Sequence, residues 1–149
     1  MSQPRRRKRK HVSDLGAKSP VLYRPCLILA VKGFACASET SLRLRRLGWD
    51  IYQACVGPEV RRLSRMLDPD VVVMDTDLEG ESGWLTCAKL EQERPGREVV
   101  LVSGEDSPCN RALAAFVGAS VLVSRQHNLV ALLQSRRVIA GGRALVEAA

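Results

Sequence analysis

Unbroken runs of apolar residues recur along this chain, separated by segments in which apolar residues follow a helical spacing. The runs are predicted to be strands, at residues 26–31, 50–54, 71–75, 98–102 and 121–124. Runs as continuous as Cys26–Val31 and Val71–Met74 suit strands buried on both faces, as in a parallel sheet covered by helices. The segment at 50–54 is short and is interrupted by the polar residues Asp50 and Gln53, so we place it at an edge of the sheet.

Helices are predicted between the strands, at residues 35–47, 57–67, 82–94, 108–117 and 129–140. Pro58 and Pro108 fall in first turns, Ser107 is placed as an N-cap, and Gly48 and Gly118 follow helix ends. Five alternating strand and helix units favour an α/β fold. The right-handed crossover rule then favours a flavodoxin-like (βα)5 doubly wound parallel sheet, with strand order 2-1-3-4-5.

The carboxylate of Asp75 comes where the strand at 71–75 should end. In open α/β sheets, ligands bind at the carboxyl ends of the strands, at the point where the strand order reverses. With this strand order, that point lies between the first and third strands, and Asp75 would lie beside the crevice. Asp75 is therefore the first candidate functional group, although aspartate is also common in turns and would suit a strand end for that reason alone.

The charge of the chain is concentrated in its first residues. The formal net charge is +7, yet residues 1–20 hold seven basic side chains and one acidic one, whereas the other 129 residues hold 16 basic and 15 acidic ones. Because it lacks apolar periodicity, the segment 1–22 is expected to be a basic disordered arm. We expect residues 23–143 to form the domain and residues 144–149 a C-terminal tail.

Cysteine usage and hydropathy favour a cytoplasmic protein. The five cysteines are odd in number and lack the spacing of a zinc site, so we interpret them as reduced thiols. No apolar stretch approaches the length of a membrane helix. The basic arm followed by Cys26–Val31 imitates an export signal, but that apolar stretch is only six residues long.

Several residues lie at set distances from Asp75. Gly83 follows it by eight residues, and Ser103, at the end of the fourth predicted strand, follows it by 28. Gly118-Ala119-Ser120 leads into the fifth strand, and residues 132–145 suit a last helix and a linker. In this order the residues resemble the CheY-like receiver domain of bacterial response regulators, and in particular the receivers of LuxR/FixJ-type regulators.

The resemblance covers residues 25–143 and implies roles for several side chains. Asp75 takes the position of the phosphoacceptor aspartate, Ser103 that of the switch serine or threonine, and Arg125 that of a lysine after the fifth strand. The implied function is that of an atypical receiver in two-component or phosphorelay signalling, with a histidine kinase or another regulator as partner. LuxR-type relatives continue into a helix-turn-helix output domain, and we expect none in this chain, which stops at Ala149.

The sequence departs from the family at the positions that hold the metal. Family members place two adjacent carboxylates after the first strand, and the matching positions here are Val31 and Lys32. The aromatic switch position is Leu122. Mg²⁺ prefers oxygen ligands, and Asp75 and Asp77 are weak candidates to supply them. We therefore expect no metal cofactor.

A cation where the family has an anion suggests how the crevice is filled. We hypothesise that the Lys32 ammonium replaces the metal and pairs with Asp75, and also with Asp77. Arg125 would supply a second cation, whose planar fork suits a carboxylate. The alternative is that the site has been lost and Lys32 is solvated. Ser103 retains two interpretations, contact with a phosphoryl group or a turn at the end of its strand.

No catalytic dyad is evident in the sequence. His11 and His127 have no carboxylate or nucleophile close to them in sequence. We therefore predict no enzyme. Trp49 and Trp84 are interpreted as packing residues.

Three functions remain open. The leading hypothesis is a stand-alone pseudo-receiver, a phosphorylation-independent protein-interaction module. It would contact a partner, or a second copy, through the face of the fourth helix, fifth strand and fifth helix, or through the first and fifth helices. The second is a working receiver phosphorylated on Asp75. The third is a nucleic-acid-associated protein that uses six consecutive basic residues, which would equally suit a solubilising tail. These residues are Arg5, Arg6, Arg7, Lys8, Arg9 and Lys10.

Overall fold

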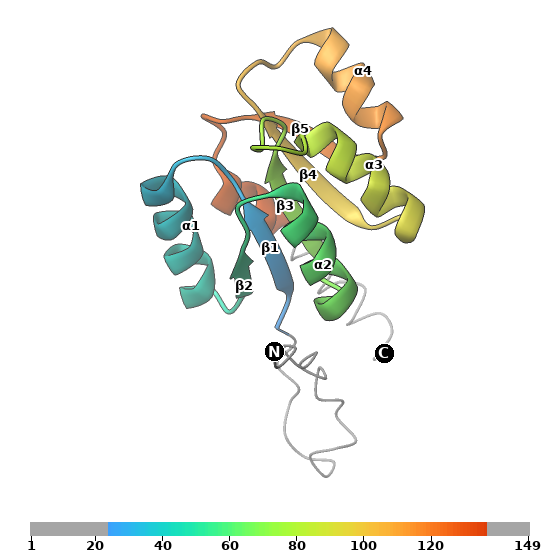
Figure 1. Cartoon of the computed structure of the whole chain (residues 1–149). Helices are drawn as coiled ribbons and strands as arrows, with labels where there is room; N and C mark the ends of the chain where they lie inside the picture. The colour runs from blue at the N-terminus through green and yellow to red at the C-terminus, as the bar shows by residue number, and fades with distance from the viewer. Residues whose placement is uncertain (1–23, 137–149) are drawn as a thin grey trace, which may run out of the picture.

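The computed structural model describes residues 24–136, except for the side chains of residues 34–36. Five strands form one sheet: β1 (Cys26–Ala30), β2 (Asp50–Gln53), β3 (Val71–Asp75), β4 (Glu98–Ser103) and β5 (Val121–Ser124). Every neighbouring pair is parallel, and the strand order is β2-β1-β3-β4-β5 (Figure 1). The predicted flavodoxin-like sheet and its strand order are confirmed.

Four helices are described from end to end: α1 (Phe34–Arg46), α2 (Gly57–Leu67), α3 (Gly83–Glu93) and α4 (Pro108–Phe116). A fifth begins at residue 129 and continues to residue 136, the last described residue. Ser82 and Ser107 are N-caps, and their hydroxyls accept from the N–H groups of Leu85 at 3.2 Å and Asn110 at 3.1 Å. The predicted end of the fifth helix lies outside the described residues.

Successive side chains of each strand point to opposite faces of the sheet, and they form two hydrophobic cores, one on each face. Ile28, Val72 and Leu101 face a cluster built with α2 and α3. Leu27 and Val73 face the opposite cluster, built with α1 and the helix at 129–136. The helices therefore cover both faces of the sheet, which explains why these strands are apolar throughout (Figure 1).

Both tryptophans are packing residues, as the sequence predicted. Trp49 is buried in the core with α1, and its indole N–H donates to the side-chain oxygen of Gln134 at 3.3 Å. Trp84 is half-buried against the core with α2 and α3. Neither ring is therefore free to serve as an open stacking surface.

The described cysteines are free thiols, and two of the four are buried. Burial raises the pKa of the Cys87 thiol to about 12, so this thiol is un-ionised at neutral pH. Within residues 24–136, no helix combines the length and the apolar composition needed to cross a membrane.

Candidate functional site

Asp75 ends the central strand β3, beside β1 and β4. The residue is 1% exposed, so its carboxylate is buried at the carboxyl edge of the sheet. Gly83, at the start of α3, packs against the same strand end. The Gly83 N–H donates to the Thr76 carbonyl at 2.9 Å, and a side chain at position 83 would collide with the carbonyl oxygen of Asp75. The glycine eight residues after Asp75 is therefore required by close packing of backbone on backbone.

Arg125 binds the buried carboxylate through two nitrogens of its guanidinium group. Its Nε donates to Oδ2 of Asp75 at 2.9 Å, and its Nη2 donates to Oδ1 at 2.7 Å. The Arg125 side chain is 40% exposed, so it covers Asp75 from the solvent side. Bidentate pairs of this kind combine charge with fixed geometry and are among the stronger hydrogen-bonded contacts in proteins. The pair occupies both oxygens of the candidate phosphoacceptor.

The turn after β3 stabilises the ionised form of Asp75. The backbone N–H of Asp77 donates to Oδ1 of Asp75 at 2.9 Å. Burial alone would raise the pKa of the Asp75 carboxyl. The hydrogen bonds from Arg125 and the Asp77 amide, helped by the charges of Arg125 and Lys32, outweigh burial and hold that pKa below its ordinary value. Hydrogen bonding to Asp75 raises the pKa of Arg125 in turn, so both partners are charged at neutral pH.

Lys32 lies at the same crevice but pairs with a different carboxylate from the one expected. Its Nζ lies 2.5 Å from Oδ2 of Asp77, whereas Asp75 feels Lys32 only through its charge. The expected pairing of Lys32 with Asp77 is thus present, and the expected pairing with Asp75 is not. The physical reason is that the Arg125 fork already takes both Asp75 oxygens. Arg125, which the sequence suggested as the second cation, is the principal one.

Gly104 makes room for the guanidinium, and sequence reasoning missed it. A Cβ at position 104 would lie 2.6 Å from Nη1 of Arg125, which is closer than such atoms approach in real structures. Position 104 directly follows the end of β4, so its backbone borders the crevice. The only sequence signal was a glycine after Ser103, at a strand end adjoining the candidate site.

Ser103 serves the turn rather than the carboxylate in this structure. The residue is buried, and its hydroxyl accepts from the N–H of Glu105 at 3.1 Å. Its carbonyl accepts from the N–H of Arg125 at 3.0 Å, which ties the end of β4 to the residue that binds Asp75. Leu122, at the position where the family has an aromatic switch residue, is buried in the core with α2 and α3.

The side chains around Asp75 do not fit a Mg²⁺ site. Both oxygens of Asp75 already accept hydrogen bonds from Arg125, and Asp77 is paired with Lys32. Among the described residues, no group of three or more His, Cys, Asp or Glu side chains is placed to hold a metal. Val31, at the other acidic-pair position, is half-buried against the core with α1. Two cations and an apolar side chain thus surround a carboxylate where a dication would need oxygen ligands.

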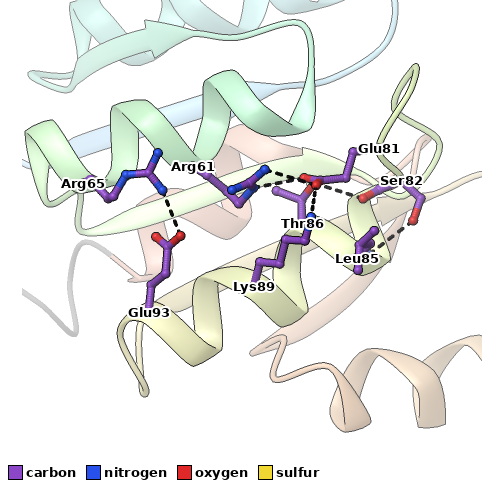
Figure 2. Close-up of polar contacts among 8 residues, drawn as sticks. All are labelled: Arg61, Arg65, Glu81, Ser82, Leu85, Thr86, Lys89 and Glu93. Carbon is purple, nitrogen blue, oxygen red and sulfur yellow. Dashed lines mark hydrogen bonds and ion pairs between the residues drawn. The ribbon is translucent and has the colours of Figure 1, made fainter.

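A second polar cluster anchors the loop that carries Asp77 (Figure 2). Glu81 ends this loop and accepts from Arg61 of α2 at 3.2 Å and from Lys89 of α3 at 2.5 Å. The Thr86 hydroxyl donates to the same carboxylate at 2.7 Å. Burial of Glu81 opposes ionisation, but these hydrogen bonds outweigh it and lower the pKa of Glu81 to about 2. Sequence reasoning gave Glu81 no role.

Gly57 completes this cluster at the start of α2. A Cβ at position 57 would collide with the Thr86 hydroxyl and would lie 2.6 Å from Oε2 of Glu81. The absence of a side chain there lets α2 approach α3 closely enough for Arg61 to reach Glu81. The cluster therefore fixes the β3–α3 loop from two helices. The basic residues 5–10, the other predicted site, lie outside the described part of the chain.

Comparison with known proteins identifies the family. The model of the response regulator receiver domain matches residues 35–136. The chain is 31% identical over 107 residues to the probable transcriptional regulatory protein TcrX of Mycobacterium tuberculosis, a match that covers 71% of this chain and 46% of TcrX. It is 26% identical over 81 residues to the aerobic respiration control protein ArcA of Escherichia coli, covering 54% of this chain and 34% of ArcA. The chain thus spans less than half the length of these relatives.

Solved structures agree on the fold. A LuxR-family two-component response regulator from Aurantimonas superposes with a TM-score of 0.69 at 24% identity, covering 80% of this chain and 87% of that one. The BeF3-activated receiver domain of Klebsiella pneumoniae RstA gives 0.68 at 22% identity, covering 76% and 96% of the two chains. At these identities the superpositions establish the fold, and the family model establishes membership. The chain belongs to the response regulator receiver domain family.

Proposed function

We propose that this receiver domain acts in two-component signalling through protein contacts that do not depend on phosphorylation of Asp75. The observation that carries the proposal is the bidentate pair, in which Arg125 donates to both oxygens of Asp75 at 2.9 Å and 2.7 Å. A phosphoacceptor carboxylate needs one oxygen free to attack phosphorus and a cation arrangement that accepts the incoming phosphoryl group. Here the cation is already bound to the nucleophile.

The type of cation matters to this proposal. A lysine is a compact charge on a flexible stem, whereas arginine presents a rigid fork that matches a carboxylate at two points. Arg125 therefore holds Asp75 in one state without a phosphoryl group or a metal. A ligand shifts an equilibrium only as far as its affinities for the two states differ. Phosphorylation would first have to break the Asp75–Arg125 pair, which disfavours the phosphorylated state.

The exposed apolar residues of α4 support a protein partner. Phe116 is 86% exposed, Leu113 is also exposed, and within α4 only Ala114 is buried. Large exposed aromatic side chains are enriched at protein interfaces. We therefore favour the face of α4 and β5 over α1 as the contact surface. The partner would be a histidine kinase, another regulator or a second copy of this chain, in the cytoplasm.

One observation favours a second candidate, a working phosphoacceptor. Asp75 is ionised, and the Arg125 side chain that covers it is 40% exposed, so this side chain has solvent into which it can swing. In that case Arg125 would release Asp75 when a phosphoryl group and Mg²⁺ arrive together. The two candidates predict different responses to a phosphoryl analogue.

Beryllofluoride with Mg²⁺ mimics a phosphoryl group on a receiver aspartate, and the RstA receiver is known in a BeF3-activated form. The test is a titration of the ¹⁵N-labelled chain, followed through the amide signals of Asp77 and Gly104. The proposal predicts no saturable shift of either signal. Saturable shifts that disappear in Asp75→Ala would contradict it and support the working phosphoacceptor.

A further inference from the structure

Four exposed arginines gather at the edge of the sheet opposite Asp75. They are Arg24, Arg43, Arg45 and Arg46. Three of them belong to the last turn of α1, and the fourth lies two residues before β1. Because α1 ends at the edge where β1 and β2 begin, the four side chains share one corner of the domain (Figure 1). We call this surface the arginine corner.

A groove of about 390 Å³ connects the two parts of the arginine corner. Arg24 and Arg45 line it, with β2 and Trp49 between them. Nη2 of Arg45 donates to the carbonyl of Ile51 at 3.2 Å, which holds this side chain against β2. Arg24 lies 3.8 Å from the carboxylate of Asp50, and its side chain is 66% exposed. Arginines from two separate segments therefore face the same groove.

The positive charge at this corner is not balanced locally. Arg43 and Arg46 form no ion pair with any residue that the structure describes. Glu39, the only acidic residue of α1, lies one turn before Arg43 and does not pair with it. The end of a helix carries about half a negative charge, which is too little to balance three arginines. Residues 24–136 hold fourteen basic and fourteen acidic side chains, so the corner is a local excess in a neutral domain.

The chain enters the domain at the same corner. Residues 5–10 are six consecutive basic residues, and Lys10 precedes Arg24 by 14 positions. An extended chain spans at most about 3.5 Å per residue, so Lys10 lies within roughly 50 Å of the corner. A tether of this length raises the local concentration of one binding element once the other is bound. The two sets of cations can therefore engage one extended polyanion together.

We propose that the arginine corner and residues 5–10 together bind the backbone of duplex DNA, without regard to its sequence. Arginine presents a planar fork that suits a phosphate group. Duplex DNA offers a regular row of phosphates that both sets of cations can contact. No aromatic residue interrupts residues 5–10, so the stacking that single strands use is not favoured. The corner lies at the opposite edge of the sheet from Asp75, so this binding does not depend on how Asp75 is paired.

An acidic protein surface is the competing occupant, because Leu42 on α1 is 50% exposed and would suit a protein partner. The composition of the surface favours DNA. The centres of protein–protein interfaces are depleted in charged residues, whereas protein–DNA interfaces are much more positively charged. The arginine corner and residues 5–10 present ten cations, and residues 5–10 include no apolar side chain.

The test is fluorescence anisotropy of a short labelled DNA duplex of mixed sequence, titrated with the full chain at several concentrations of sodium chloride. Arg43→Gln combined with Arg46→Gln removes two exposed cations that have no ion-pair partner among the described residues. This double variant should bind about tenfold more weakly, and the slope of log K against log salt should become shallower by about 2. The matched control, Arg62→Gln with Arg111→Gln, removes the same charge from exposed arginines of α2 and α4 and should bind like the native chain.

Two further measurements make the test specific. Arg24→Gln, on the other side of the groove, should weaken DNA binding by several fold, and urea denaturation checks that every variant is folded. A polyglutamate peptide, titrated as a competitor, separates DNA from an acidic protein. The proposal is overturned if the full chain does not bind the duplex saturably at low salt, if the double variant at the corner binds like the control, or if polyglutamate binds as tightly as the duplex.

Discussion

Arg125 binds both carboxylate oxygens of Asp75, although the two residues lie 50 positions apart in the sequence. Parallel strands bring them together, because β3 and β5 end at the same edge of the sheet with β4 between them. The carbonyl of Ser103 then orients the Arg125 backbone. Asp75, the candidate phosphoacceptor, is consequently one half of an ion pair that three strand ends bring together.

The two residues should be strongly coupled in a double-mutant cycle, and the two single substitutions should cost different amounts of stability. Arg125→Gln leaves a carboxylate that is 1% exposed without its partner, and should cost about 3 kcal/mol of unfolding free energy at pH 7. Asp75→Asn leaves an arginine that is 40% exposed and free to reach water, and should cost about 1 kcal/mol. Urea denaturation of both single variants and the double variant measures the coupling. Additive effects of the two substitutions would show that the pair contributes nothing to stability.

The cost of Arg125→Gln should also depend on pH. In the native chain the pKa of Asp75 is held below its ordinary value of 3.8, so its contribution to stability is present above pH 3.8 and is lost as pH falls further. Without Arg125, burial is opposed only by the Asp77 amide and the charge of Lys32, and we expect the pKa of Asp75 to rise above 3.8. Acidification from pH 7 towards pH 4 should then stabilise the variant relative to the native chain, and the gap in unfolding free energy should narrow.

Gly104→Ala should weaken the Asp75–Arg125 pair without changing either of these two residues. The added Cβ would lie 2.6 Å from Nη1 of Arg125, so something must shift, and we expect the guanidinium to move and its hydrogen bonds to Asp75 to lengthen. The pKa of Asp75 should rise, as measured by ¹³C NMR titration of its carboxyl signal. Gln126→Ala, an exposed neighbour of Arg125, is the control and should leave that pKa where it is. An unchanged Asp75 titration in Gly104→Ala would mean that Gly104 does not set the position of Arg125.

Glu81→Gln should destabilise the domain at neutral pH and have less effect in acid. The drop in the pKa of Glu81 from 4.5 to about 2 corresponds to about 3 kcal/mol at 1.36 kcal/mol per unit. Solvent screening at Lys89, whose side chain is 39% exposed, reduces the expected cost to about 1–2 kcal/mol. Because the folded pKa is depressed, the contribution is complete above pH 4.5 and is lost as pH falls towards 2.

The check on Glu81 is denaturant unfolding at several pH values between 7 and 3. Glu79→Gln is the matched control, since Glu79 is an exposed acidic residue in the same loop. The control should lose little stability at any of these pH values. A Glu81→Gln deficit that stays constant down to pH 3 would show that the carboxylate charge is not what ties the loop to α2 and α3.

The fold could be predicted because burial on both faces leaves a direct trace in the sequence. Val71–Met74 is apolar without interruption, and the structure buries every residue of β3. Asp75 could be located for a similar reason, since it follows that run and keeps its spacing to Gly83 and Ser103. These features depend on single segments and on short distances along the chain.

Which side chains pair within the site depends on distances across the sheet, and no local sequence pattern predicts these distances. Lys32 and Arg125 are both cations at strand ends, and only the three-dimensional reach of each side chain decides which one binds Asp75. Gly104 acts by the absence of a side chain, and Glu81 has its partners 20, 5 and 8 residues away on two helices. Their roles became visible only when these segments were brought together.

Whether Asp75 accepts a phosphoryl group decides the central claim. The positive control is a variant that combines Val31→Asp, Lys32→Asp and Arg125→Lys, which restores the two carboxylates and the lysine of the family pattern. Phosphorylation of this variant would show that the assay detects the modification on this fold. Asp75→Ala, in either background, identifies the modified residue.

The most direct measurement is the intact mass of the native chain after incubation with a small phosphodonor and Mg²⁺. Since Arg125 holds both oxygens of Asp75 and no described carboxylate set fits Mg²⁺, the account predicts an unchanged mass for the native chain. It predicts the gain of one phosphate for the restored variant. A stoichiometric gain of one phosphate by the native chain, abolished by Asp75→Ala, would contradict the account.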